Sequence, residues 1–356
     1  MKTGIITYYD VPNYGAVLLA FSMKKILEQS GHEVVFLKYK RHREMDRTHS
    51  IRLRGMRIWH PNALRAAVFE HIKIQRIASF RKKNLSAGDY YDIPQGLDMI
   101  VVGSDQIFDC KYEFNPYQFA VNVPCDKIIS YAPSFGEFNY EDLQSFPALG
   151  RLKEFVCRFT LHSARDENTR KILSFLTGKT IETVLDPVLL YGFEEEKQVW
   201  NRRIIRERYL IVYTWGGYTV SSGFRNSVLE FAQRNELKTV SIGDFRPWCD
   251  YNYAAASPVT FFELFQHCEM VITNMFHGTC FSILFGKPFY TMLMEHNRNK
   301  TGDLLSRFGL TSQGLESPEA LEGKGIPTID YLSVNTILEK NRQDSCRYLK
   351  EAINTK

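Results

Sequence analysis

Two stretches of the sequence combine residue types that suit proton transfer and anion binding. In 273–279, which reads Thr-Asn-Met-Phe-His-Gly-Thr, His277 follows a short apolar run and precedes a glycine. An imidazole can move a proton near neutral pH. In 163–166, Arg165 presents a planar guanidinium, which suits the oxygens of a carboxylate or a phosphate. We expect a proton donor in the first stretch and an anion ligand in the second.

Two further polar loops follow apolar runs. In Gly103-Ser104-Asp105-Gln106, an acid just past a buried strand can orient a hydroxyl or accept its proton, so Asp105 is a candidate catalytic residue. The loop 13–15, which reads Asn-Tyr-Gly, precedes a predicted helix, whose first amides favour anions. The loop lacks the three-glycine fingerprint and the Gly-Lys-Ser/Thr phosphate loop, so nothing indicates dinucleotide or ATP binding.

Each of these four loops also has a purely structural interpretation. Arg165 can pair with Asp166 or with Asp186, and the loop 103–106 can cap the turn that follows it. The loop 13–15 can be a tight turn, and a lone histidine such as His277 is often structural. These alternatives stay open at the level of the sequence.

Alternating strands and helices must position the four loops. The predicted strands are 2–9, 34–37, 97–102, 127–132, 209–214, 239–242, 270–273 and 288–292. The predicted helices are 16–30, 141–155, one ending at 175 and capped by Asp166 or Asn168, 223–234, 261–267, 279–285 and 334–353. This order predicts an α/β protein with two doubly wound parts, in which ligands bind beyond the carboxyl ends of the strands.

The length of the chain supports two domains. Its 356 residues exceed the ~250–300 that one hydrophobic core usually serves. A charge-rich stretch at 194–208 suits a linker. We therefore expect an N-terminal α/β domain at 1–195, a C-terminal α/β domain at 196–330 and a final helix within 331–356.

Composition limits the setting and the partners. Seven scattered cysteines without C-x-x-C spacing predict reduced thiols and no structural metal. No signal peptide and no run of about 18 apolar residues is present, so we expect a cytoplasmic protein. The segment 38–83 holds fourteen Lys or Arg against three acids. It is either a solvated face or a contact with the inner face of the membrane or with a diphosphate-bearing acceptor. No nucleic-acid module accompanies it.

Six short motifs, in order along the whole chain, resemble those of the polysaccharide pyruvyl transferase family. They are Tyr8 with 13–16 (Asn-Tyr-Gly-Ala), 102–106 (Val-Gly-Ser-Asp-Gln), 130–136 (Ser-Tyr-Ala-Pro-Ser-Phe-Gly), 163–167 (Ser-Ala-Arg-Asp-Glu), 185–187 (Leu-Asp-Pro) and 273–278 (Thr-Asn-Met-Phe-His-Gly). The resemblance implies a fold like that of B-type glycosyltransferases (GT-B). In that fold two Rossmann-like domains face each other across a cleft, and the last helix packs back on the first domain.

The resemblance also implies the reaction. The donor would be phosphoenolpyruvate, with no cofactor and no metal. The acceptor would be a sugar with two suitably placed hydroxyls, in a surface polysaccharide or its lipid-linked precursor. The product would be a cyclic pyruvate ketal plus phosphate. Such a reaction needs an acid, a base and ligands for two anionic groups.

The same resemblance assigns roles to residues, with the acceptor on the N-terminal domain and the donor on the C-terminal one. His277 would be the general acid or a phosphate ligand, Arg165 would bind the carboxylate or phosphate of the donor, and Asp105 would orient or deprotonate an acceptor hydroxyl. The amides of Gly278 and Thr279 would hold phosphate oxygens. Further expected substrate contacts are Asn13, Tyr14, Gly15, Ser104 and Asn274.

One position departs from the family pattern. Characterised members often carry an arginine two residues before the motif histidine, where it helps to bind the donor, and here that residue is Met275. Arg298 or Lys300, expected in a loop after the last strand, are the candidate replacements. The departure leaves open a glycosyltransferase that uses a nucleotide sugar. The basic segment 38–83 suggests a further alternative, a non-catalytic scaffold of a capsule-assembly complex.

Overall fold

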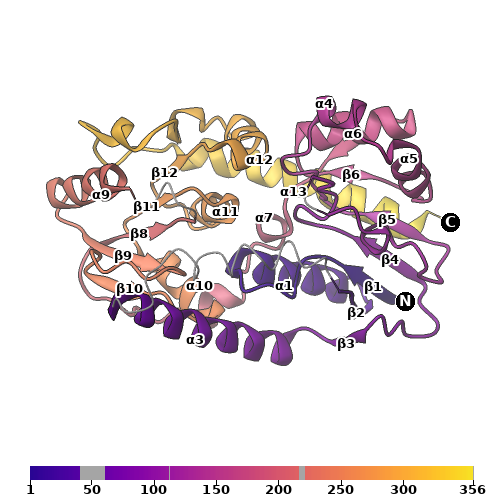
Figure 1. The fold of residues 1–356 in the computed structure, drawn as a ribbon, viewed down its shortest axis with the longest axis horizontal. Helices are drawn as coiled ribbons and strands as arrows, with labels where there is room; N and C mark the ends of the chain where they lie inside the picture. Colours follow the sequence, from indigo (N-terminus) through magenta and orange to yellow (C-terminus); the bar gives the residue numbers. More distant parts are fainter. Residues whose placement is uncertain (41–60, 112, 216–220, 356) are drawn as a thin grey trace.

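Two parallel sheets form the framework of the protein. The computed structural model describes residues 1–40, 61–111, 113–215 and 221–355. Within them, one sheet has the strand order β3-β2-β1-β4-β5 and the other β10-β9-β8-β11-β12-β13. In both, the first strand lies between the second and the fourth of its own series, which is the Rossmann order. The predicted pair of Rossmann-like domains is confirmed (Figure 1).

The strands are short and mostly buried. The first sheet contains β1 (Lys2–Ile6), β2 (Glu33–Lys38), β3 (Ala87–Tyr90), β4 (Met99–Val102) and β5 (Ile128–Ser130). The second contains β8 (Tyr209–Tyr213), β9 (Lys238–Ile242), β10 (Tyr251–Tyr253), β11 (Met270–Thr273), β12 (Phe289–Met292) and β13 (Gly314–Leu315). Between them in sequence, β6 (Ser163–Ala164) pairs with β7 (Glu182–Thr183). The predicted boundary at 195–196 falls between β7 and β8.

Helices follow most of the strands. In the first half these are α1 (Tyr14–Gln29), α3 (Pro61–Asn84), α4 (Tyr140–Gln144), α5 (Leu149–Cys157), α6 (Glu167–Thr177), α7 (Pro187–Tyr191) and α8 (Glu196–Val199). In the second half they are α9 (Ser222–Arg234), α10 (Pro258–His267), α11 (Phe276–Leu284), α12 (Glu295–Arg307) and α13 (Tyr331–Asn354). Among the described helices, none has the length and apolar character that crossing a membrane requires.

One apolar cluster joins the two sheets. It includes Leu18 of α1, Val188 of α7, Phe265 of α10 and Phe281 of α11, all fully buried. Separate clusters cover the outer face of each sheet. Because a large apolar contact opposes relative motion of domains, this shared core holds the two halves at a defined separation.

Two long helices also connect the halves (Figure 1). The helix α13 returns from the C-terminal half, and Tyr348 donates its hydroxyl to the Ser130 carbonyl at 2.7 Å. The helix α3 runs along both halves, and its Lys73 and Arg76 donate to the carbonyls of Gly243 (3.0 Å) and Ala255 (2.6 Å). The latter half of the basic segment 38–83 is therefore partly a domain bridge, while its residues 41–60 lie outside the described ones.

The structure corrects three predicted elements. The helix predicted at 141–155 is two helices, α4 and α5, with Pro147 between them, because proline disfavours a helical residue before it. The helix α11 begins at Phe276, so His277 and Gly278 lie in its first turn instead of before it. Residues 295–307 form the helix α12, where a loop was expected.

Two other predictions concern helix starts. Of the two candidate caps of the helix ending near 175, Asp166 caps α6 and accepts a hydrogen bond from the Thr169 amide at 2.8 Å. Tyr14, expected to contact substrate, instead packs between the domains. Its ring stacks on Phe261 with centroids 4.9 Å apart, and its hydroxyl donates to the Ala256 carbonyl at 2.9 Å.

Replacing Tyr14 by phenylalanine should therefore weaken the domain contact. The change removes the hydroxyl and leaves the Ala256 carbonyl without this donor, which should lower the free energy of unfolding by about 1–2 kcal/mol. Urea unfolding of the variant and the wild type measures the difference. An unchanged midpoint would show that the bond across the domains contributes nothing to stability.

Candidate active site

The polar loops of both halves meet where the strand orders reverse. The loops 13–15 and 103–106 follow β1 and β4, and the loop 273–277 follows β11. A side chain on Gly15 would overlap the His277 ring, so the start of α1 touches the start of α11 across the domain boundary. Glycine is needed at position 15 because only it lets the two helix starts approach so closely.

The carboxylate of Asp186 is the centre of this region. Its Oδ1 accepts the Val188 amide at 3.0 Å and thereby caps α7. Its Oδ2 accepts Nη1 of Arg165 at 3.0 Å and lies 3.5 Å from Nε2 of His277. The exposed fractions of Asp186, Arg165 and His277 are 2%, 4% and 6%. The two residues predicted to share one ligand therefore share one carboxylate.

Asp105, which is partly buried, completes the cluster on the N-terminal side. Its Oδ1 lies 3.4 Å from Nη2 of Arg165, and its backbone has a positive φ of 66°, a conformation uncommon for residues other than glycine. The Arg165 guanidinium also lies over the Phe276 ring, 4.2 Å from its centroid. Two carboxylates and an aromatic face thus surround Arg165, which confirms the pairing with Asp186 that the sequence left open.

Both aspartates of the cluster stay ionised. Burial alone would raise the pKa of Asp105, but the positive charges of Arg165, His277 and Lys300 outweigh it and hold that pKa below its usual value. Burial would likewise raise the pKa of Asp186, and His277 and Arg165 lower it instead. Asp105 is therefore a carboxylate that can accept a hydrogen bond or a proton.

Lys300 is the cation of the cluster that remains available. It lies on α12 with an exposed fraction of 9%, and within the described residues its ammonium makes no hydrogen bond and no ion pair. Burial lowers the pKa of Lys300 to about 8, although Asp105 acts in the opposite direction. Arg298, the other candidate replacement for an arginine at 275, pairs at the surface with Glu316 and does not join the cluster. Met275 itself packs against the apolar core.

Several predicted substrate contacts hold the loops in place. The Asn274 side chain accepts from the Trp215 amide at 2.8 Å and donates to its carbonyl at 2.6 Å. Ser104 Oγ donates to the Ala132 carbonyl at 2.6 Å, and Asn13 Oδ1 caps α1 through the Gly15 amide at 2.8 Å. Their roles as substrate ligands stay predictions.

The predicted phosphate ligands on α11 need one correction. The Thr279 amide donates to the Met275 carbonyl at 3.2 Å as part of the helix, so it is not free to bind phosphate. Gly278 packs so tightly on Thr273 that a side chain there would overlap it. Gly278 therefore positions the first turn of α11, which carries His277.

Asn297 is a supporting residue that the sequence did not indicate. It is 1% exposed and donates to the carbonyls of Asn274 (2.7 Å) and Met292 (3.0 Å). It ties the start of α12, and so Lys300, to the loop that precedes His277. A polar residue soon after a strand is the signal that could have found it, but the helix α12 was not predicted.

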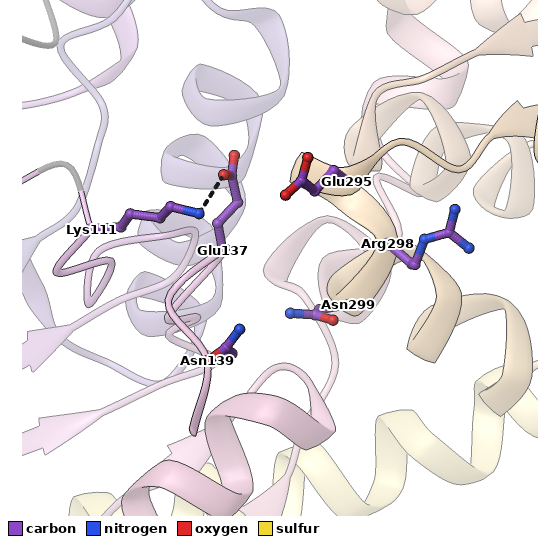
Figure 2. A pocket seen from close by; sticks show the side chains of 6 residues that line it. All are labelled: Lys111, Glu137, Asn139, Glu295, Arg298 and Asn299. Carbon is purple, nitrogen blue, oxygen red and sulfur yellow. Dashed lines mark ion pairs between the residues drawn. The ribbon is translucent and has the colours of Figure 1, made fainter. Parts of the chain in front are cut away.

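A pocket of about 250 Å³ lies between the two halves beside the cluster. Figure 2 shows its two walls facing each other. The lining residues are Lys111, Glu137 and Asn139 from the N-terminal half and Glu295, Arg298 and Asn299 from α12. The Asp109 carboxylate accepts the backbone amides of Lys111 and Glu137 and interacts electrostatically with Lys300, so the pocket lies near the buried cluster. Arg298 thus belongs to the pocket rather than to the cluster.

Replacing Asp186 by asparagine should destabilise the fold. The change removes a buried charge and leaves Arg165 with Asp105 alone, and breaking a buried pair in this way should cost about 3 kcal/mol. Urea unfolding checks this. Glu316→Gln is the matched control, because it breaks an exposed pair with Arg298 and should leave the midpoint unchanged. Equal midpoints for all three proteins would contradict the assigned role of Asp186.

Comparisons with known proteins fit this geometry. The model of a family described as polysaccharide pyruvyl transferase matches residues 13–296. The search of curated proteins gave no match.

Solved structures share the architecture. UGT73P12 from Glycyrrhiza uralensis, complexed with glycyrrhetinic acid 3-O-monoglucuronide, is similar over 99% of this chain and 95% of its own, with 9% identity and a TM-score of 0.50. UGT89C1 from Arabidopsis thaliana, complexed with UDP-L-rhamnose, is similar over 98% and 97%, with 12% identity and a TM-score of 0.50. The UDP-GlcNAc 2-epimerase from Neisseria meningitidis is similar over 100% of this chain and 95% of its own, with 13% identity and a TM-score of 0.48. At these identities the likeness concerns the fold alone, and the fold is GT-B.

Proposed function

Because the chain belongs to the polysaccharide pyruvyl transferase family and is a transferase that acts on polysaccharides, we propose that it transfers a pyruvyl group from phosphoenolpyruvate to a sugar. Two sugar hydroxyls add to the enol carbon of the donor, the bond from that carbon to the phosphate oxygen breaks, and the methylene group becomes a methyl group. One hydroxyl proton ends on that methyl group and the other on the phosphate. The products are a cyclic ketal and inorganic phosphate.

The observation that carries the proposal is the convergence of His277, Arg165 and Lys300 with two ionised aspartates at the domain boundary. The reaction needs a proton donor, a proton acceptor and a cation for the donor, and these groups supply all three within one buried cluster. The low exposure of the cluster strengthens each charge interaction, because water screens it little.

His277 is the proton donor in this scheme. The Asp186 carboxylate lies 3.5 Å from Nε2 and orients the ring, as the third group of a catalytic constellation does for its histidine. The proton moves from His277 to the methylene carbon, which makes the neighbouring enol carbon electrophilic. Asp105 accepts the proton of the attacking hydroxyl.

Lys300 takes the place of the missing arginine at position 275. Its ammonium is buried and unpaired within the described residues, whereas Arg165 is occupied by Asp105 and Asp186. We therefore assign the phosphate or carboxylate of the donor to Lys300. Arg165 holds the two aspartates in position and adds positive charge behind them.

Removing either group should stop phosphate release. His277→Ala lacks the proton donor and should lower kcat by about 10²–10⁴-fold. Lys300→Met keeps the length of the side chain without its charge and should chiefly raise KM for phosphoenolpyruvate. Acceptor-dependent release of phosphate from a panel of glycosides, with a UDP-sugar as the alternative donor, measures both. If the wild type, like the two variants, releases no phosphate from phosphoenolpyruvate with any acceptor, the proposed reaction is refuted.

The pH dependence of donor binding tests Lys300 separately. The Lys300 ammonium is charged below about pH 8 and neutral above it, because burial depresses its pKa. KM for phosphoenolpyruvate should therefore rise as the pH increases through about 8. In Lys300→Arg, whose guanidinium stays charged, this rise should disappear or move to higher pH. An identical pH profile for the two proteins would show that Lys300 does not bind the donor.

A further inference from the structure

The pocket between the two halves differs from the buried cluster in its chemistry. Glu137 faces Glu295 from the opposite wall, and Asn139 and Asn299 add carboxamides beside them (Figure 2). Glu137 pairs with Lys111 at 3.4 Å, whereas within the described residues Glu295 makes no ion pair or hydrogen bond through its side chain. Carboxylates and carboxamides accept and donate hydrogen bonds to hydroxyl groups.

Hydrogen bonds to the backbone fix the N-terminal wall of the pocket. The buried Asp109 carboxylate accepts the Lys111 amide at 3.0 Å and the Glu137 amide at 3.3 Å. Gly136 lies so close to Asp109 that a side chain there would overlap it. Asn139 and Asp142 form a reciprocal capping box, in which Asn139 Oδ1 accepts a hydrogen bond from the Asp142 amide at 2.9 Å. The side chains of this wall therefore start from fixed backbone positions.

The opposite wall is fixed to the cluster. It is the first part of α12, whose start is tied down by Asn297 through the Asn274 carbonyl. On this helix Asn299 lines the pocket, and the next residue, Lys300, is buried with the aspartates. Lys300 also interacts electrostatically with Asp109, whose carboxylate supports the other wall, so a ligand in the pocket lies near the group that Lys300 binds.

Charge and size select the kind of ligand. The two carboxylates of the lining are balanced by the cations Lys111 and Arg298, so the lining has no net charge. It suits a neutral molecule rich in hydroxyls better than the anion phosphoenolpyruvate. A volume of about 250 Å³ lies below the ~300–1,000 Å³ of typical drug-sized ligand sites, so it suits one sugar ring better than a nucleotide sugar.

We propose that this pocket binds the acceptor sugar through Glu137, Glu295, Asn139 and Asn299, next to a donor held in the buried cluster. The assignment rests on the proposed function for the identity of the donor. The two substrates are thus separated by charge: the anionic donor binds Lys300, and the neutral acceptor binds in the pocket.

The test compares binding of the two substrates to single variants of the full chain. The probes are phosphoenolpyruvate and the methyl glycosides of galactose, glucose, mannose and N-acetylglucosamine, each titrated by calorimetry. Glu137→Gln and Glu295→Gln should weaken the binding of the best glycoside by about tenfold each, because each loses a charge-assisted hydrogen bond. Their affinity for phosphoenolpyruvate should not fall. Lys300→Met should show the reverse pattern.

Glu141→Gln is the matched control, since Glu141 is an exposed carboxylate near Asn139 that does not line the pocket. It should bind every probe as the wild type does. The assignment is overturned if no glycoside binds the wild type, if the two pocket variants keep full affinity for the glycoside, or if they lose phosphoenolpyruvate instead.

The outcomes separate this inference from the proposed function. Glycoside binding that depends on Glu137 and Glu295, together with no binding of phosphoenolpyruvate, would keep the sugar pocket and refute the donor. Phosphoenolpyruvate binding that depends on Lys300, together with glycoside binding that ignores both glutamates, would keep the donor and refute the sugar pocket.

Discussion

The structure depends on one buried carboxylate with three partners. Asp186 caps α7, accepts a hydrogen bond from Arg165 and faces His277. A buried charge is costly unless its partners replace the water it loses, and here each oxygen has a partner. These partners belong to different segments: the stretch after β6, the start of α7 and the start of α11. Satisfying Asp186 therefore brings the chemical groups of both halves together.

Rigidity around this carboxylate comes from apolar packing. The core shared by α1, α7, α10 and α11 joins the two halves through apolar contacts that oppose their relative motion, and α13 adds a second connection. A site whose groups come from two domains needs such support, because small displacements weaken catalysis strongly. The close contact of Gly15 with His277 shows how little freedom remains at the boundary.

The charges of the site are arranged in two layers. In the inner layer, Arg165 pairs with Asp105 and Asp186. The ammonium of Lys300, which makes no ion pair within the described residues, adds a positive charge that can bind an anion. In the outer layer, which is the lining of the pocket, Glu137 and Glu295 are balanced by Lys111 and Arg298, so this layer has no net charge. The helix α12 belongs to both layers, so its position couples them. The neutral Met275 is compatible with this arrangement because the cation comes from α12 instead.

The sequence by itself determined the alternation of strands and helices and the family, and it limited the cap of α6 to Asp166 or Asn168, because periodicity, caps and short motifs are local properties. It also indicated His277 and Arg165 as residues of one site. Only the tertiary structure decided which of Arg298 and Lys300 is buried. Both lie on α12, two residues apart, and the surroundings of that helix distinguish them.

Tertiary structure likewise decided that Tyr14 joins the domains and that Arg165 pairs with Asp105, 60 residues away in sequence. Such contacts bring together residues far apart in the chain. No local pattern specifies them, because they depend on how two sheets pack around a common core.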